Sequence, residues 1–254
     1  GNELIDYMMG YGALILGHSH PSVTEAVTQK LSQGTHMGSA TPIEIRWAEL
    51  VQKLIPSAER VRFTASGTET TLLAFRLSRA YTGKRKIVKF REHFHGWHDY
   101  VSPESGINTQ AGIPKETLSS VIVAEPIIEE IENLLRQDTD IAAVIIEPTG
   151  GHWGQFPLPN PKFLQELRRI TNDNNVVMIM DETITGFRMS RGGAQERFNV
   201  LPDLTTMGKI VAGGLPGGCI AGKAEIMDLI SAEDASNRIA HPGTFNGNPI
   251  SAAA

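Results

Sequence analysis

The sequence predicts an α/β protein with a mostly parallel, doubly wound sheet and helices on both of its faces. Apolar runs of strand length alternate with amphipathic segments of helix length along the chain. The run at 176–180 is apolar throughout, which is typical of a strand buried on both faces of a parallel sheet. No internal repeat or low-complexity segment interrupts this order, so one large domain is expected.

The composition excludes several classes of protein. The 254 residues are 41% hydrophobic and 20% charged, as in a soluble globular protein. A net charge of −5 disfavours a nucleic-acid-binding surface, and no signal peptide or apolar span of membrane length is visible. The single cysteine, Cys219, excludes an internal disulfide and fits a reducing compartment. We therefore expect a cytoplasmic protein that acts on small molecules, with no nucleic-acid or membrane partner.

The first part of the chain predicts two helices. Ser22 can cap the first, whose apolar residues have helical spacing and which ends at Gly34. The second is expected at 42–54, where Pro56 terminates it. Its predicted buried residues are Trp47, Leu50, Val51 and Leu54.

The following elements supply the sheet and its covering helices. Strands are expected at 61–64, 86–90, 120–123, 141–147 and 176–180, with further strand-like stretches at 204–207 and 218–221. Helices are expected after the turn at 65–69, ending near Tyr81, and at 127–137, 161–172 and 224–230. The polar stretch at 101–117 contains glycines and prolines, which indicates a loop and a possible lid over a site.

Asp181 and Lys209 are the candidate catalytic residues. Asp181 follows the buried strand at its carboxyl end, where open α/β sheets bind ligands. Lys209 lies in a glycine-rich segment that lets the backbone approach a ligand. Pyridoxal phosphate needs a lysine amine to hold its aldehyde and a carboxylate to keep its ring nitrogen protonated. Taken singly, a turn-capping aspartate and an exposed lysine are the simpler explanations, but the pair predicts this cofactor.

A candidate anion site precedes these residues. Ser66, Gly67 and Thr68 connect the strand at 61–64 to the helix after it. Unpaired N–H groups and the helix dipole favour an anion at such a junction, and a phosphate would fit there. A simple N-cap by Ser or Thr is the alternative.

Three motifs give the sequence a resemblance to a known family. They are DETITGFR at 181–188, PDLTTMGKIVAGGLPGG at 202–218 and GTFNGNP at 243–249. In this order and spacing they resemble the class III pyridoxal-phosphate aminotransferases, most closely the glutamate-1-semialdehyde 2,1-aminomutases. The resemblance covers nearly the whole chain and implies the large domain of a fold-type I pyridoxal-phosphate-dependent transferase.

The resemblance also implies roles for further residues. Phe94 would stack on the cofactor ring beside His95, and Thr183 would lie under the ring. His152, after the EPxxG motif that begins at Glu147, would lie near the ring hydroxyl and the substrate. Tyr11 matches an aromatic residue of the substrate pocket, although a core tyrosine is equally compatible. The full cofactor-binding set is Ser66, Gly67, Thr68, Phe94, His95, His152, Asp181, Thr183, Lys209 and Thr244.

The resemblance implies a homodimer and a larger domain organisation. A threonine at the position of Thr244 reaches the cofactor phosphate of the neighbouring subunit in the family. Residues 1–45 would be the remnant of an N-terminal segment leading into the large domain, and residues 46–254 would form the cofactor-binding large domain. The family's C-terminal small domain would lie outside this sequence.

The histidine-rich run at 91–99 allows a different explanation. His93, His95 and His98 with Asp99 resemble the HxHxDH metal-binding motif of metal-dependent hydrolases. Trp97 stands where that motif has an aspartate, and no second set of spaced His and Asp residues follows. We therefore expect no metal site.

The expected function is pyridoxal-phosphate-dependent transfer of an amino group between an amino acid or amine and a carbonyl acceptor. Aminomutases use the same groups for intramolecular transfer, so they remain the alternative. His152 for asparagine, Phe94 for tyrosine, Thr183 for valine and a shorter lid depart from the aminomutase pattern and favour an aminotransferase. A metal-dependent hydrolase and a catalytically silent binding protein are the remaining alternatives, and the presence of both Asp181 and Lys209 disfavours the latter.

Overall fold

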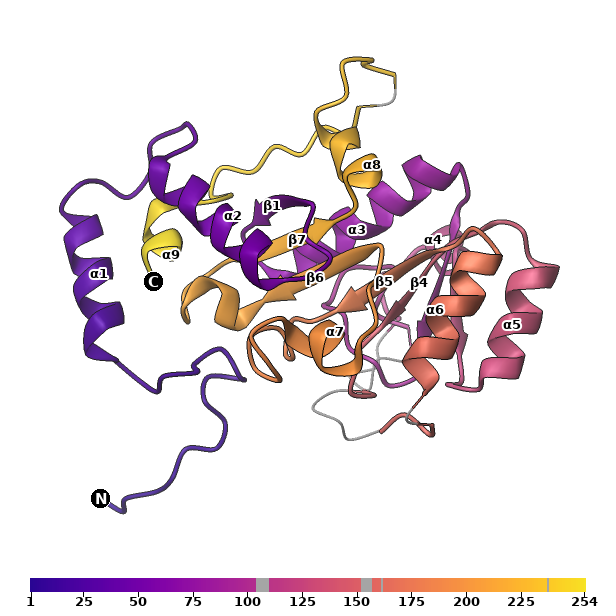
Figure 1. Ribbon diagram of the computed structural model, residues 1–254, viewed down its shortest axis with the longest axis horizontal. Coiled ribbons are helices and arrows are strands. Elements are labelled where there is room, and N and C mark those ends of the chain that lie inside the picture. The colour runs from indigo at the N-terminus through magenta and orange to yellow at the C-terminus, as the bar shows by residue number, and fades with distance from the viewer. Residues whose placement is uncertain (104–109, 152–156, 161, 237) are drawn as a thin grey trace.

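The computed structural model describes residues 1–103, 110–151, 157–160, 162–236 and 238–254 (Figure 1). The strands are β1 (Arg60–Thr64), β2 (Lys86–Phe90), β3 (Val121–Ala124), β4 (Ile141–Ile146), β5 (Val177–Asp181), β6 (Leu204–Gly208) and β7 (Gly218–Gly222). The helices are α1 (Pro21–Leu31), α2 (Pro42–Leu54), α3 (Gly67–Thr82), α4 (Lys115–Leu118), α5 (Ile128–Gln137), α6 (Phe163–Asp173), α7 (Gly193–Phe198), α8 (Ala224–Met227) and α9 (Pro249–Ala253), with 3₁₀ turns η2 (Lys209–Ala212) and η3 (Asp228–Ile230).

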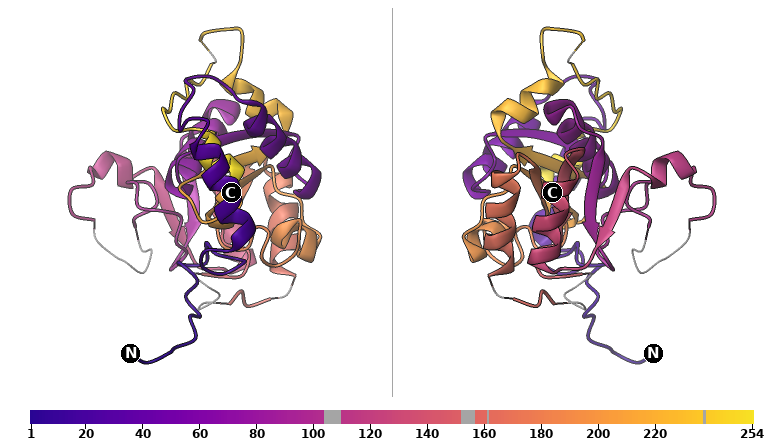
Figure 2. Two further views of the ribbon diagram at one scale, coloured as in Figure 1. Left: turned by 90° about the vertical axis from the view of Figure 1, so that its left-hand side faces the viewer. Right: turned by 90° about the vertical axis from the view of Figure 1, so that its right-hand side faces the viewer.

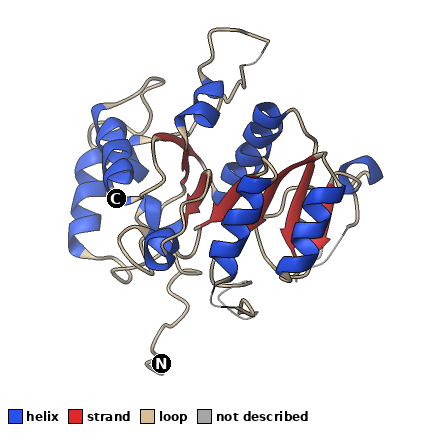
Figure 3. Ribbon diagram, turned by 45° about the vertical axis from the view of Figure 1, so that its right-hand side comes forward, coloured by secondary structure: helices blue, strands red, loops and turns tan. Residues whose placement is uncertain are grey.

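The strands form one sheet in the order β1-β7-β6-β5-β4-β2-β3. From β6 to β3 all neighbours pair in parallel, whereas β7 is antiparallel to both β6 and β1. Helices lie on both faces of the sheet (Figure 3). The predicted α/β class with a mostly parallel, doubly wound sheet is therefore confirmed.

Alternate residues of the central strands enter two different cores. In β2, Ile87 packs in the core that includes α3, and Val88 packs in the core under α5 and α6. A third core lies between α2 and the β1, β6 and β7 part of the sheet, where Trp47 stacks on Phe63 with 3.8 Å between ring centroids. Burial on both faces explains why the central strands are apolar without alternation.

Two local predictions for the early helices are wrong. Pro21 begins α1 and Ser22 lies within it, while the N-cap residue His20 makes no side-chain cap bond. Proline suits the first helical position because its missing N–H would have no partner there. In α2, Trp47 and Val51 are buried but Leu50 is 53% exposed, since only one narrow side of this helix faces the sheet.

Three helices were not predicted from the sequence. Helix α4 begins within the predicted loop at 101–117 and ends just after it, and α7 and α9 follow glycine-rich segments. The buried carboxylate of Glu182 accepts bonds from Ala194 N and Gln195 N at the start of α7. Glu182 lies 12 residues before Ala194 in the sequence, so its bonds to α7 leave no helical pattern of apolar residues from which the helix could be predicted.

The beginning of the chain lies apart from the sheet. Both views of Figure 2 show it extending from the body of the protein, and Leu4, Ile5 and Tyr7 are exposed. Helix α1 has no buried residue and packs against α9 near the other terminus. None of the helices in the described residues is long and apolar enough to cross a membrane.

Candidate active site

Three ionisable side chains meet at the carboxyl edge of the sheet. Asp181 is the last residue of β5, Glu147 directly follows β4 and Lys209 directly follows β6. Because β4, β5 and β6 are parallel neighbours, their ends lie side by side at the edge where open α/β sheets bind ligands. All three residues line one cavity of about 170 Å³.

Lys209 has an unusual backbone conformation. Its φ of 52° lies in the left-handed region, which costs a non-glycine residue roughly 1 kcal/mol. The conformation turns the chain from β6 into η2. Burial lowers the pKa of Lys209, although the carboxyl groups of Asp181 and Glu147 oppose the shift. A lower pKa increases the fraction of neutral amine, which is the nucleophilic form.

Asp181 is a buried carboxylate held by neutral donors. Its Oδ2 accepts a bond from His95 Nδ1 at 2.8 Å, and its Oδ1 accepts bonds from Thr183 N and Oγ1 and from Thr206 Oγ1. Burial alone would raise the pKa of Asp181, but the bonds from His95 and Thr183 outweigh it and lower the pKa. Asp181 is therefore ionised at neutral pH.

His95 is neutral and has a defined tautomer. Burial lowers its pKa despite the bond to Asp181. Since an ionised carboxylate can only accept, the proton of His95 is on Nδ1. The ring thus orients Asp181 without supplying a formal positive charge.

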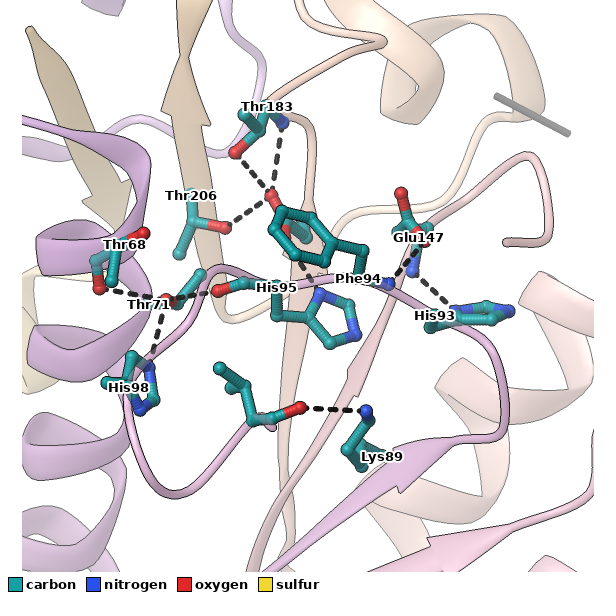
Figure 4. A network of polar contacts seen from close by, with 12 residues as sticks. Thr68, Thr71, Lys89, His93, Phe94, His95, His98, Glu147, Thr183 and Thr206 are labelled. Atoms are coloured by element: carbon teal, nitrogen blue, oxygen red, sulfur yellow. Dashed lines mark hydrogen bonds and ion pairs between the residues drawn. The ribbon is translucent and has the colours of Figure 1, made fainter. Parts of the chain in front are cut away.

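The loop that follows β2 is tied to two neighbouring elements (Figure 4). Phe94 N donates to Glu147 Oε2 at 2.9 Å, and Glu147 N donates to His93 Nδ1 at 3.1 Å. Gly96 has a φ of 105°, and a Cβ there would lie 2.6 Å from Thr68 Oγ1. Only glycine allows the loop to approach α3 this closely, which brings Phe94 into the cavity wall.

Glu147 is the acidic residue that the sequence analysis did not select. Burial, and then the negative charge of Asp181, raise its pKa to about 8. At neutral pH the cavity therefore contains a protonated Glu147 beside an ionised Asp181. The available signal was its position, because Glu147 directly follows its strand and Asp181 is the last residue of the neighbouring one. Ile184, in the cavity wall, and Thr206 were also missed.

The start of α3 is suited to an anion. Ser66 is the N-cap and its side chain accepts from Glu69 N, while Glu69 Oε2 accepts from Ala65 N. The N–H groups of Gly67 and Thr68 have no acceptor among the described residues, as expected in a first helical turn. Both residues line the cavity. The predicted cap is therefore present, and it leaves the N–H groups of Gly67 and Thr68 available to an anion.

The groups around the cavity fit pyridoxal phosphate. Lys209 has an amine that can react with the aldehyde of the cofactor, and Asp181 suits a protonated ring nitrogen. Phe94 offers an aromatic face to the ring. The free N–H groups at the start of α3 suit the phosphate. Gly208 permits close packing here, because a Cβ at this position would lie 3.2 Å from Thr183 Cγ2. The donor set and the space agree with the predicted cofactor.

The structure brings most of the predicted site residues together. Those that line the cavity are Gly67, Thr68, Phe94, His95, Asp181, Thr183 and Lys209. Tyr11 is 70% exposed and lies outside this lining. Thr244 lines a separate groove of about 400 Å³ with Glu44 and Arg62. His152 lies outside the described residues.

The histidine run does not converge on a common point. His93 accepts from Glu147 N, His95 binds Asp181, and His98 Nε2 lies 3.1 Å from Thr71 Oγ1. Within the described ranges, no group of three His, Cys, Asp or Glu side chains is arranged to hold a metal ion. The histidines instead fix the loop and the acidic groups of the cavity.

Comparison with known proteins gives consistent matches. The aminotransferase class-III family profile matches residues 1–254. Glutamate-1-semialdehyde 2,1-aminomutases from Sulfolobus acidocaldarius and Methanothermobacter thermautotrophicus are 46% and 47% identical over 98% and 100% of this chain, and over 60% and 61% of their own lengths. An omega-transaminase structure from Sphaerobacter thermophilus is 39% identical with a TM-score of 0.90, covering 98% of this chain and 60% of that one. A structure described as a transaminase with PLP bound is 32% identical with a TM-score of 0.91 and the same coverage.

The fold and the cavity thus define a pyridoxal-phosphate-dependent protein of fold type I. The chain belongs to the aminotransferase class-III family. It spans about three fifths of the length of the curated relatives that it matches. The predicted family, fold type and cofactor are confirmed, and the metal-dependent hydrolase has no support.

Proposed function

We propose that this protein transfers an amino group between an amino acid or amine and a carbonyl acceptor, using pyridoxal phosphate. The observation that carries the proposal is the placement of Lys209 and Asp181 in one cavity with the free N–H groups of α3. When bound, the cofactor supplies an electron sink for the bond that breaks at the substrate carbon. The protein supplies attachment, orientation and proton transfer.

Lys209 has two roles in this proposal. Its amine holds the cofactor covalently, and its lowered pKa makes the neutral form available for that bond. As a free amine, Lys209 Nζ would also take a proton from the α carbon of the substrate and deliver it to the carbon that receives it in the transfer. Both roles need a buried amine, and only part of the Lys209 surface is exposed.

Asp181 and its neighbours act on the ring. The ionised carboxylate stabilises a positive charge on the ring nitrogen, and His95 keeps the carboxylate in place. Phe94, Gly67 and Thr68 line the cavity, so Phe94 would offer its face to the ring, and the N–H groups of Gly67 and Thr68 would hold the phosphate. Ser66 contributes by capping α3, which holds those N–H groups in position.

A glutamate-1-semialdehyde 2,1-aminomutase is the second candidate, because relatives with that name are 46% and 47% identical to this chain. The two activities differ in whether the half-reacted substrate is released. Incubation of the full-length protein with glutamate semialdehyde, and separately with amine donors plus a keto acid, distinguishes them. Turnover of neither would count against both candidates.

The covalent role of Lys209 has a direct test. The loaded protein should show a visible absorption band, and borohydride reduction should leave a modified peptide that contains Lys209. Reduction at Lys84, Lys86 or Lys223 instead would refute the assignment. Lys209→Ala is the matched control and should lose the band.

A homodimer is proposed with this function, with Thr244 serving the phosphate site of the partner subunit. Its support is the position of Thr244 outside the cavity of its own chain. Thr244→Ala and Lys209→Ala should each be inactive, and co-refolding them should restore part of the activity through mixed dimers. Mixed dimers without activity would show that Thr244 serves the site of its own chain.

A cytoplasmic location is also proposed. Its support is the lone, buried Cys219, because a free thiol fits a reducing compartment.

A further inference from the structure

The two oxygens of Asp181 have different surroundings. Oδ1 accepts from Thr183 N at 3.1 Å, Thr183 Oγ1 at 2.6 Å and Thr206 Oγ1 at 3.0 Å. Oδ2 accepts only from His95 Nδ1 among the described residues. A carboxylate oxygen has about two lone-pair sites, so Oδ1 is saturated and Oδ2 can accept one further donor.

The two threonines are themselves fixed by packing. Thr206 is fully buried and pairs with Asp181 across β5 and β6, so the register of the sheet places its hydroxyl. The side chain of Thr183 is confined by two glycines, because a Cβ at Gly67 or Gly208 would lie within 3.3 Å of it. Neither hydroxyl has another hydrogen-bond partner among the described residues.

We propose that the hydroxyls of Thr183 and Thr206 are positioning groups that lock the Asp181 carboxylate, so that Oδ2 alone receives the positively charged N–H of the cofactor ring. This inference rests on the proposed function and deepens it. The ring N–H takes the remaining lone pair of Oδ2, beside the bond from His95.

The same two hydroxyls influence whether the proton between Asp181 and the ring nitrogen lies on the carboxylate or on the nitrogen. Hydrogen bonds to the charged form stabilise it, so they make the carboxylate less basic. A less basic Asp181 leaves the proton on the ring nitrogen, where it sustains the electron sink. Removal of one hydroxyl shifts the proton equilibrium towards Oδ2 by about tenfold, the size expected for a bond to a charged group.

The test uses the enzyme loaded with pyridoxal phosphate carrying ¹⁵N in its ring. Thr183→Val and Thr206→Val keep the side-chain shape and remove one hydroxyl each. Both should move the ring nitrogen resonance towards its unprotonated position. Thr183→Ser restores the hydroxyl and should return the resonance to the wild-type position.

Thr205→Val is the matched control, because Thr205 lies beside Thr206 on β6 but bonds to Ser57 and Gln195. It should lower stability without moving the resonance.

The Asp181→Asn variant distinguishes a failure of the locking role from a failure of the proposed function. If Asp181→Asn moves the resonance but the Thr183 and Thr206 variants do not, the locking role is wrong and the proposed function stands. If Asp181→Asn leaves the resonance unchanged, the proposed role of Asp181 fails.

Discussion

Two buried aspartates lie at opposite ends of β5 and have opposite kinds of partner. Asp181, at the carboxyl end, is 4% exposed and is held by a neutral histidine and by threonine groups. Asp203 is 5% exposed, and its carboxylate accepts from Met178 N at the amino end of β5. It also contacts Arg168 and Lys223, each at 2.8 Å.

The difference separates a structural acid, Asp203, from Asp181, the acid to which we assign a function in the proposal. The charge of Asp203 is compensated within the chain, because two cations share it. Asp181 contacts no lysine or arginine within the described parts of the chain, so its charge remains available to a cation that binds in the cavity. A buried charge without a bonded cation is costly, and such groups are found where function requires them.

The largest expected effect is the loss of activity in Asp181→Asn. The variant keeps the size of the side chain and removes its charge, so the fold should persist. Removal of one such electrostatic partner typically costs on the order of a hundredfold to a thousandfold in rate. Steady-state kinetics on protein of verified cofactor content measures it. An unchanged rate would assign the electron-sink role to another group.

The second prediction extends the comparison to Glu147, which also lacks a bonded cation among the described residues. Its pKa is about 8 in the folded protein against 4.5 in an ordinary glutamate. Between these values only the folded state holds the proton. The free energy of unfolding contributed by Glu147 is therefore present below pH 4.5 and is lost as pH rises to about 8.

Glu147→Gln should remove this slope, which is on the order of 5 kcal/mol across the window from pH 4.5 to about 8. Urea unfolding of the cofactor-free protein at several pH values measures it. A variant with the same slope as wild type would show that Glu147 ionises normally in the fold.

The third prediction concerns Asp203→Asn. This change leaves Arg168 and Lys223 without their shared anion and should lower the free energy of unfolding by about 2 kcal/mol. Activity per folded molecule should stay near that of wild type. Lys223→Met is the matched control, and it should cost below about 1 kcal/mol because the Lys223 side chain is 44% exposed. A folded Asp203→Asn protein as inactive as Asp181→Asn would erase the distinction between the two acids.

The sequence predicted the elements whose signals are local. The apolar runs placed β2, β4 and β5 within one or two residues of their observed bounds, and α2 begins and ends as predicted. Predictions from local sequence patterns failed where a helix or side chain depends on contacts with residues distant in the chain. Helix α7 depends on the buried carboxylate of Glu182, and the exposure of Leu50 depends on which side of α2 meets the sheet.

The sequence by itself determined that a strand-end aspartate and a lysine in a glycine-rich segment belong to an α/β protein of this family. It selected Asp181 rather than Asp203 by the position after a buried strand, but it did not show how the charge of either acid is compensated. Tertiary structure decided that difference, because the compensating charges come from distant positions in the chain, such as Arg168 and Lys223 around Asp203. It also decided that Glu147 stands beside Asp181, because only the strand order of the sheet makes β4 and β5 neighbours.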